Sequence, residues 1–60
     1  MPKVKDKLMD EVYEVYGARE IEYTEHEYEG SWEVRETEFL LHKYGSWGWY
    51  NAKYYEPYDL

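Results

Sequence analysis

The sequence predicts an α+β fold, in which one N-terminal helix packs on a three-stranded antiparallel sheet within a single domain, residues 1–60. Apolar residues recur every three to four positions near the N-terminus, and polar and apolar residues alternate through most of the remaining chain. A chain of 60 residues has room for one small core and, without cysteine, no disulfide can stabilise it. Aromatic residues, 22% of the chain, are expected to fill that core.

Residues 3–16 are predicted to form the helix. The apolar residues that fall on one helical stripe in this range are Val4, Leu8, Val12 and Val15. Pro2 suits the first helical position, and Gly17 suits the position just after the last turn. The pattern and both end signals therefore favour a helix of about four turns.

Three strands are expected to follow, at residues 19–29, 32–44 and 49–56. Gly30-Ser31 fits a two-residue type II′ turn between the first two strands, because glycine suits the first position of that turn. Residues 45–48, Gly-Ser-Trp-Gly, are predicted to form a four-residue turn, and Pro57 is predicted to end the third strand. The expected order of elements is α-β-β-β.

The two predicted turns direct opposite faces of strand 32–44 toward the core. The first turn pairs Glu25 with Glu36 and favours Trp32, whereas the second favours Phe39. A bulge between Arg35 and Glu38 would reverse the alternation and reconcile them. The predicted core then comprises Val4, Leu8, Val12, Val15, Ile21, Tyr23, Phe39, Leu41, Tyr50, Ala52 and Tyr54.

The negative charge of the chain is concentrated in one segment. The formal net charge is −7, and residues 20–38 contain eight glutamates and one arginine, while the flanking segments are each neutral. A 14-residue helix is about 21 Å long, so it cannot cover the full length of two long strands. The tip of the first hairpin, residues 25–36, is therefore predicted to project as an acidic arm.

The acidic arm suggests a function in binding. We expect it to occupy the Lys/Arg groove of a basic nucleic-acid-binding protein and to exclude the nucleic acid, because it presents closely spaced negative charge. The predicted partner-binding residues are Glu25, Glu27, Glu29, Glu33, Glu36 and Glu38, with Tyr28 and Trp32 as apolar anchors. The alternative is that the glutamates only prevent edge-to-edge aggregation and keep a tyrosine-rich chain soluble.

This profile of small size, acidity, absence of cysteine and α+β layout resembles that of small phage-encoded inhibitors, the anti-CRISPR proteins in particular. Many of those are acidic single-domain proteins, and several act as DNA mimics that block the site where a CRISPR surveillance complex or nuclease reads its target. The resemblance covers the whole chain and includes no sequence motif, so no family residue is transferred by position. It implies a stoichiometric inhibitor in the cytoplasm of an infected bacterium, with a type I surveillance complex as one suitable partner.

Catalysis and metal binding are not expected from this sequence. His26 cannot share a strand face with Glu25 and Glu27, because adjacent residues point to opposite faces, and the predicted register places it opposite Arg35. The Glu25–Glu36 pair has no evident cleft around it. We therefore expect a non-enzymatic protein without cofactor or metal. The N-terminus lacks the apolar core of a signal peptide and no apolar run is long enough to span a membrane, so a cytoplasmic location is expected.

Aromatic residues dominate residues 44–58. Those predicted to lie on the open face of the sheet are Tyr44, Trp47, Trp49, Tyr55 and Tyr58. An acidic protein is a poor ligand for nucleic acid, so direct base stacking is not expected. A second functional hypothesis is a small structural or adaptor subunit that oligomerises, as a homodimer for example, through this aromatic face.

Overall fold

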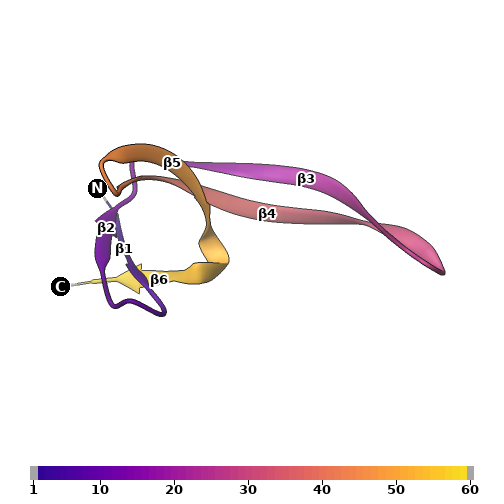
Figure 1. Ribbon diagram of the computed structural model, residues 1–60, viewed down its shortest axis with the longest axis horizontal. Coiled ribbons are helices and arrows are strands. Elements are labelled where there is room, and N and C mark those ends of the chain that lie inside the picture. Colours follow the sequence, from indigo (N-terminus) through magenta and orange to yellow (C-terminus); the bar gives the residue numbers. More distant parts are fainter. Residues whose placement is uncertain (1, 60) are drawn as a thin grey trace.

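The computed structural model describes residues 2–59, which form two three-stranded antiparallel sheets (Figure 1). The first sheet has the order β2-β1-β6 and the second has the order β3-β4-β5. The elements are β1 Lys3–Asp6, β2 Val12–Glu14, β3 Gly17–Glu27, β4 Gly30–Lys43, β5 Ser46–Asn51, the 3-10 helix η1 Ala52–Tyr54 and β6 Tyr55–Tyr58. The predicted α+β fold with an N-terminal helix is therefore wrong, because no α-helix occurs within residues 2–59.

The predicted helix 3–16 is a β-hairpin of β1 and β2. The Asp6 carboxylate accepts hydrogen bonds from the backbone N–H groups of Leu8, at 2.8 Å, and Met9, at 3.1 Å. Such side-chain bonds to the backbone compete with helical hydrogen bonds and favour a turn. Asp10 adopts a φ of 58° in the same turn, and Leu8, predicted to lie in the core, is 86% exposed. The valines and Tyr13 of this segment suit strands.

The predicted third strand is divided in two. Its first part is β5, and the chain then turns through η1 into β6, which pairs with β1 in the other sheet. Pro57 does not end this strand but lies within β6, opposite Val4. Because β6 is an edge strand of its sheet, it can accept a residue that lacks a backbone N–H.

The long hairpin of β3 and β4 forms as predicted in outline, but its register differs. The connecting residues are Tyr28 and Glu29, not Gly30 and Ser31, so Trp32 pairs with Glu25 instead of Glu29. A shift of four residues is even, and each side chain therefore stays on its predicted face. Pairing is unbroken from Gly17 opposite Leu40 to Glu27 opposite Gly30, so the predicted bulge between Arg35 and Glu38 is absent from this hairpin.

The hairpin of β4 and β5 turns at Tyr44 and Gly45 instead of residues 45–48. Their φ values of 53° and 79° are both positive, as in a type I′ turn. A β-carbon on Gly45 would meet no atom within 4 Å, so only backbone strain opposes a larger residue. We expect Gly45→Ala to lower the free energy of unfolding by about 1 kcal/mol, measured by urea denaturation. Ser46→Ala, at an exposed neighbouring position, is the control and should leave stability unchanged within error.

The core lies between the two sheets. Its buried apolar residues are Val4, Val15, Leu41 and Tyr55, and the partly buried residues packed against them are Tyr13, Phe39 and Tyr50. Five predicted core residues are thereby placed correctly: Val4, Val15, Phe39, Leu41 and Tyr50. Four others are wrongly predicted and are exposed, namely Leu8, Val12, Tyr23 and Tyr54. Ile21 and Ala52 are half-buried outside this cluster.

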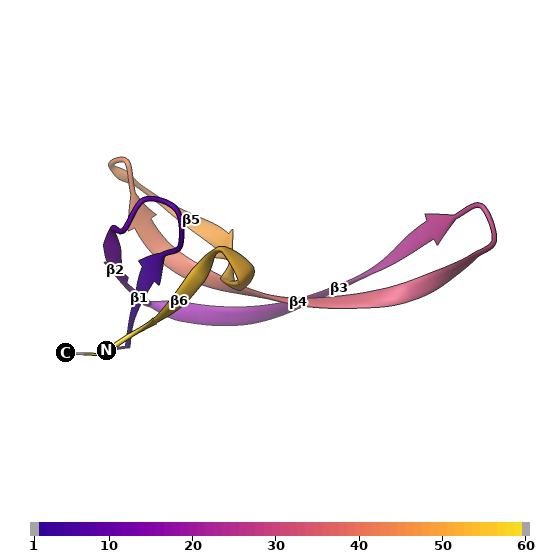
Figure 2. The ribbon, with the colours of Figure 1, turned by 90° about the horizontal axis from the view of Figure 1, so that it is seen from below.

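The molecule is elongated, with extents of 45 × 20 × 19 Å. Figures 1 and 2 show the reason: the two sheets form a small body at one end, and the β3–β4 hairpin continues well beyond it as a twisted two-stranded ribbon. Strong twist is usual in a ribbon of only two strands. The projecting hairpin predicted from the glutamates is therefore present, although a sheet and not a helix forms the rest of the body.

Candidate functional site

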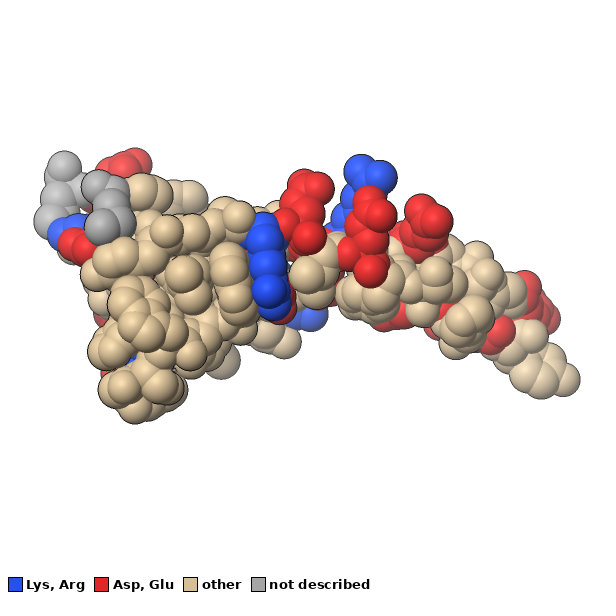
Figure 3. Space-filling view, turned by 90° about the horizontal axis from the view of Figure 1, so that it is seen from above, with Lys and Arg blue, Asp and Glu red and all other residues tan. Residues whose placement is uncertain are grey.

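The projecting part of the hairpin is the arm, which comprises residues 22–35 instead of the predicted 25–36. It contains five glutamates and one arginine, a formal charge of −4 of the total −7. All its residues are exposed except Val34, which is half-buried. The space-filling view in Figure 3 shows acidic side chains gathered along the ribbon, whereas the visible surface of the body is mainly uncharged. The charge is thus physically separated from the core.

The register distributes the acid over both faces of the arm. Glu25 and Glu27 lie on the face that also carries Trp32, while Glu33 lies on the opposite face with Glu22. Glu29 is in the turn at the tip. Glu22 forms an ion pair with Arg35, at 2.6 Å, but both side chains are more than half exposed, so this pair adds little stability. The arm therefore presents negative charge in every direction.

Glu36, predicted to belong to the partner-binding set, is instead engaged at the root of the arm. Its Oε1 accepts a hydrogen bond from the Tyr23 hydroxyl at 3.1 Å, and its Oε2 accepts one from the Asn51 amide. The Lys53 ammonium lies 3.9 Å from Oε1. Because body residues occupy this carboxylate, it is not free to imitate a phosphate. The predicted pairing of Glu25 with Glu36 is also wrong, since Ile21 lies opposite Glu36.

Glu38 is likewise bound by a side chain of the body and does not belong to the exposed acidic surface of the arm. The Arg19 guanidinium contacts its Oε1 through Nε and Nη2, each at 2.8 Å. The same guanidinium lies over the ring of Trp49, 4.2 Å from the centroid, which adds a cation–π contact. This stack fixes Glu38 against the body. Of the six predicted glutamates, only Glu25, Glu27, Glu29 and Glu33 remain on the arm.

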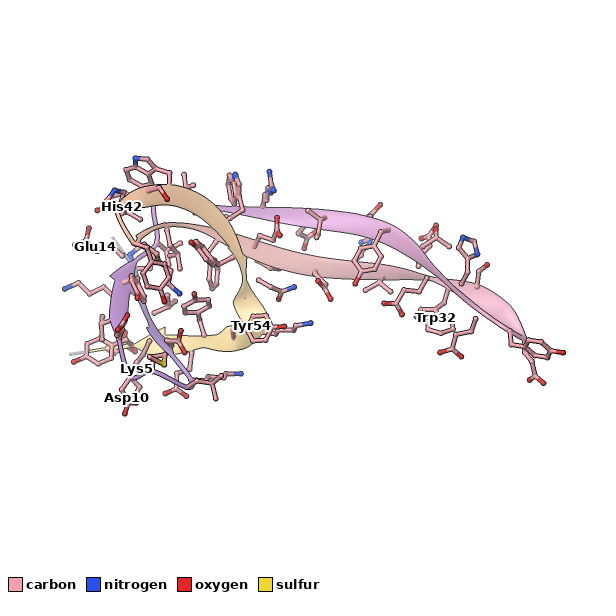
Figure 4. The ribbon with its side chains drawn as sticks, viewed as in Figure 1. Lys5, Asp10, Glu14, Trp32, His42 and Tyr54 are labelled. Atoms are coloured by element: carbon pink, nitrogen blue, oxygen red, sulfur yellow. The ribbon has the colours of Figure 1, made fainter. Side chains whose placement is uncertain are left out.

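The two predicted aromatic anchors do lie on the arm. Tyr28 is in the turn and is fully exposed, and Trp32 is 44% exposed opposite Glu25. Figure 4 shows Trp32 on the ribbon, far from the labelled side chains of the body. Large aromatic side chains held in water are favourable contact points for a partner, because burying them releases much apolar surface.

Tyr23 makes the root of the arm sensitive to alkaline pH. Partial desolvation raises the pKa of its phenol above the ordinary 10.0, and the hydrogen bond to Glu36 raises it further. Since the folded-state pKa is the higher one, the associated stabilisation is complete below pH 10 and is lost as the pH rises through the folded-state value. We expect the urea midpoint to fall less steeply above pH 10 in Tyr23→Phe than in the wild type. Tyr28→Phe, at the exposed tip, should retain the steeper wild-type fall.

The arm carries an open hollow, lined by Glu22, Tyr23, Thr24 and Glu33. His26 lies opposite Ser31 and not opposite Arg35 as predicted. Within residues 2–59, no group of three or more histidine, aspartate or glutamate side chains is arranged to hold a metal ion.

The aromatic face of the body is smaller than predicted. Trp47 is 57% exposed and makes edge-to-face contacts with Tyr16, at a centroid distance of 4.9 Å, and with His42, at 5.0 Å. Trp49 and Tyr44 are also exposed, as predicted. Tyr55 is buried in the core, however, and Tyr58 belongs to the other sheet, so neither extends this face.

Sequence reasoning missed the charged centre of the core, Lys43, which is only 8% exposed. Its ammonium donates a hydrogen bond to the Tyr55 hydroxyl at 2.7 Å and lies 3.7 Å from the Asp6 carboxylate. The surrounding rings are those of Tyr13, Tyr44, Tyr50 and Tyr55, with centroids 4.7–5.4 Å away. Burial lowers the pKa of Lys43, but the interactions with Tyr55, Tyr13 and Tyr44 together outweigh burial and raise it overall. Alternate residues of a strand share one face, so the core positions Phe39 and Leu41 predict that Lys43 faces the core as well.

Comparison with protein-family models, curated proteins and solved structures finds no match for this chain. Among the described residues, no helix has the length and apolar character needed to cross a lipid bilayer. The fold and the site together define a small β protein with a projecting acidic hairpin (Figure 1).

Proposed function

We propose that this protein is a non-enzymatic inhibitor whose arm binds in the basic groove of a nucleic-acid-binding protein and excludes the nucleic acid. One observation carries the proposal: the glutamates of the arm are exposed on both faces of a hairpin that projects from the body. Glu25, Glu27, Glu29 and Glu33 form no salt bridge within residues 2–59. Their charge is available to lysine and arginine side chains of a partner.

The arm adds little to the stability of the fold, and this favours a role in binding over a role in solubility. A two-stranded hairpin without a core is only marginally stable in water, so an arm of this length gains little from packing. The rest of the chain already carries a formal charge of −3, which favours solubility without an arm. Concentrated charge on a projection also accelerates association with an oppositely charged groove.

The proposed partner is a basic nucleic-acid-binding protein or complex in the bacterial cytoplasm. A CRISPR surveillance complex belongs to this class and is the partner that the anti-CRISPR resemblance suggests. Two features fit such a groove: negative charge on both faces of the arm, and the exposed rings of Tyr28 and Trp32 near its tip. The ring contacts would be buried between the ionic ones, where aromatic residues contribute most to affinity.

A pull-down of tagged protein from bacterial lysate at low and high salt tests the proposal. We expect recovery of a basic nucleic-acid-binding protein that is lost at high salt and displaced by added DNA, because ionic contacts are screened and nucleic acid competes for the groove. A partner that resists salt and ignores DNA would contradict the proposal.

A second candidate is an adaptor that self-associates through the aromatic face of the body. The exposure of Trp47, packed edge-on against Tyr16 and His42, favours it, since exposed aromatic clusters often mark interfaces. Sedimentation of the pure protein distinguishes the two: a dimer that dissociates on Trp47→Ser supports the adaptor, and a monomer at all concentrations excludes it.

A further inference from the structure

We infer that the groove which receives the arm is one that normally holds a single nucleic-acid strand, and not a duplex. This inference rests on the proposed function and specifies its partner class. Three properties of the arm support it: its thickness, the density of its charge, and the exposed aromatic rings between its glutamates.

The arm is one ribbon of two strands with no second layer. Paired strands lie about 4.8 Å apart, and the side chains extend from both faces of the ribbon. The molecule's smaller extents of 20 and 19 Å include the body, which contains both sheets (Figure 1). A duplex is much wider, because its major groove alone is about 12 Å across. A cleft shaped for a duplex would leave the ribbon loosely seated, whereas a narrow channel would contact both faces.

The charge of the arm is too sparse for a duplex. Its −4 charge, which includes Glu29 in the turn, is spread over strand 22–27, its partner and the turn, a length of about 23 Å, or one net charge per roughly 6 Å. Duplex DNA carries one charge per about 1.7 Å of axis, and one strand carries one per about 3.4 Å. The charge density of the arm is thus about three- to fourfold lower than that of a duplex and about half that of one strand, so it lies closer to the single strand.

The exposed rings match the other feature of single-strand grooves. Such grooves combine a basic track along the backbone with aromatic side chains on which unpaired bases stack. In a duplex the faces of the bases are already stacked on one another and are not offered to a protein. The arm presents Trp32 beside Glu25 and Glu27, and Tyr28 beside Glu29, so flat rings and negative charges occur together as they do along an unpaired strand.

Competitive elution tests this inference. Bacterial lysate proteins are bound to a single-stranded DNA resin and, separately, to a double-stranded DNA resin, and each is eluted with the purified protein at low salt. We expect release of proteins from the single-stranded resin at protein concentrations that release nothing from the duplex resin. Tyr28→Asn and Trp32→Ala should each raise the concentration needed by about 5-fold to 150-fold, the range measured for loss of one stacking contact.

Tyr54→Asn is the matched control, because Tyr54 is an exposed tyrosine of the body that belongs neither to the arm nor to the aromatic face. It should elute like the wild type. Tyr28 is fully exposed, so its replacement is not expected to disturb the fold even if Trp32→Ala loosens the ribbon. Equal release from both resins, or wild-type release by Tyr28→Asn and Trp32→Ala, would overturn the single-strand inference and leave the proposed function standing. Release from neither resin would overturn both.

Discussion

Replacing Lys43 by alanine is expected to lower the free energy of unfolding by about 3 kcal/mol, because it empties the centre of the core and removes a desolvated cation–π cluster. A domain of this size has a total stability of only about 3–9 kcal/mol. At the lower end of that range, about half of the Lys43→Ala molecules would be unfolded in water at 25 °C. Urea denaturation followed by tryptophan fluorescence measures the change.

Two further variants separate the charge of Lys43 from its packing. Lys43→Met keeps an unbranched side chain of similar length but removes the ammonium that contacts Tyr55 and Asp6. It should be intermediate in stability, since the stem still fills the space between the rings. Lys3→Ala, at an exposed strand position, should resemble the wild type. If Lys43→Met were as stable as the wild type, the ammonium would contribute nothing and the cluster would be explained by packing alone.

The difference between the predicted helix and the observed hairpin at residues 3–16 has a local cause. Val4 and Val15 are buried, and their spacing is compatible with either structure. The Asp6 carboxylate decides between them, because it satisfies two backbone donors that a helix would have used differently. Three of the four supposed helical apolar residues are valines, which strands favour. Residue preference was therefore more informative than period in this segment.

The long hairpin was predictable, whereas its turn was not. Alternation over residues 19–44 correctly indicated two long strands with the acid between them. Glycine was assigned to the turn itself, but Gly30 follows the turn, with a φ of 156°, and Gly45 is the second residue of its turn. Both registers consequently moved by four residues. The predicted bulge was meant to bring both ends of β4 to the same core. Only the part of β4 within the body faces a core, so no bulge is needed.

The loss of Glu36 and Glu38 from the predicted site follows from that register. The observed pairing places Arg19 opposite Glu38, where the predicted pairing placed Tyr23. The contacts of Asn51 and Lys53 with Glu36 depend on the path of β5 and η1, which no local pattern in the sequence specifies. The exposure of the glutamates nearer the tip could be predicted from the sequence, because no other part of the chain contacts them.

Reversing the charge of the arm is expected to abolish partner binding. Glu25→Lys with Glu27→Lys changes the arm from −4 to 0 and the whole chain from −7 to −3. Recovery of the partner in the low-salt pull-down should fall by about 100-fold or more, because two attractive contacts become repulsive ones. The pair is a better test than one that includes Glu36, since Glu36→Lys would also break the hydrogen bonds that attach the arm to the body.

A control of equal charge decides what the reversal means. Glu14→Lys with Asp59→Lys also brings the net charge to −3, but both residues are exposed on the body. If the arm variant loses the partner and the body variant retains it, the position of the charge matters and the arm is the binding surface. If both lose it equally, binding depends on net charge and the proposed groove contact is wrong. If neither loses it, the glutamates serve only solubility, and the aromatic face of the body becomes the surface to test. Circular dichroism of each variant confirms that the strands are retained, so that loss of binding is not loss of fold.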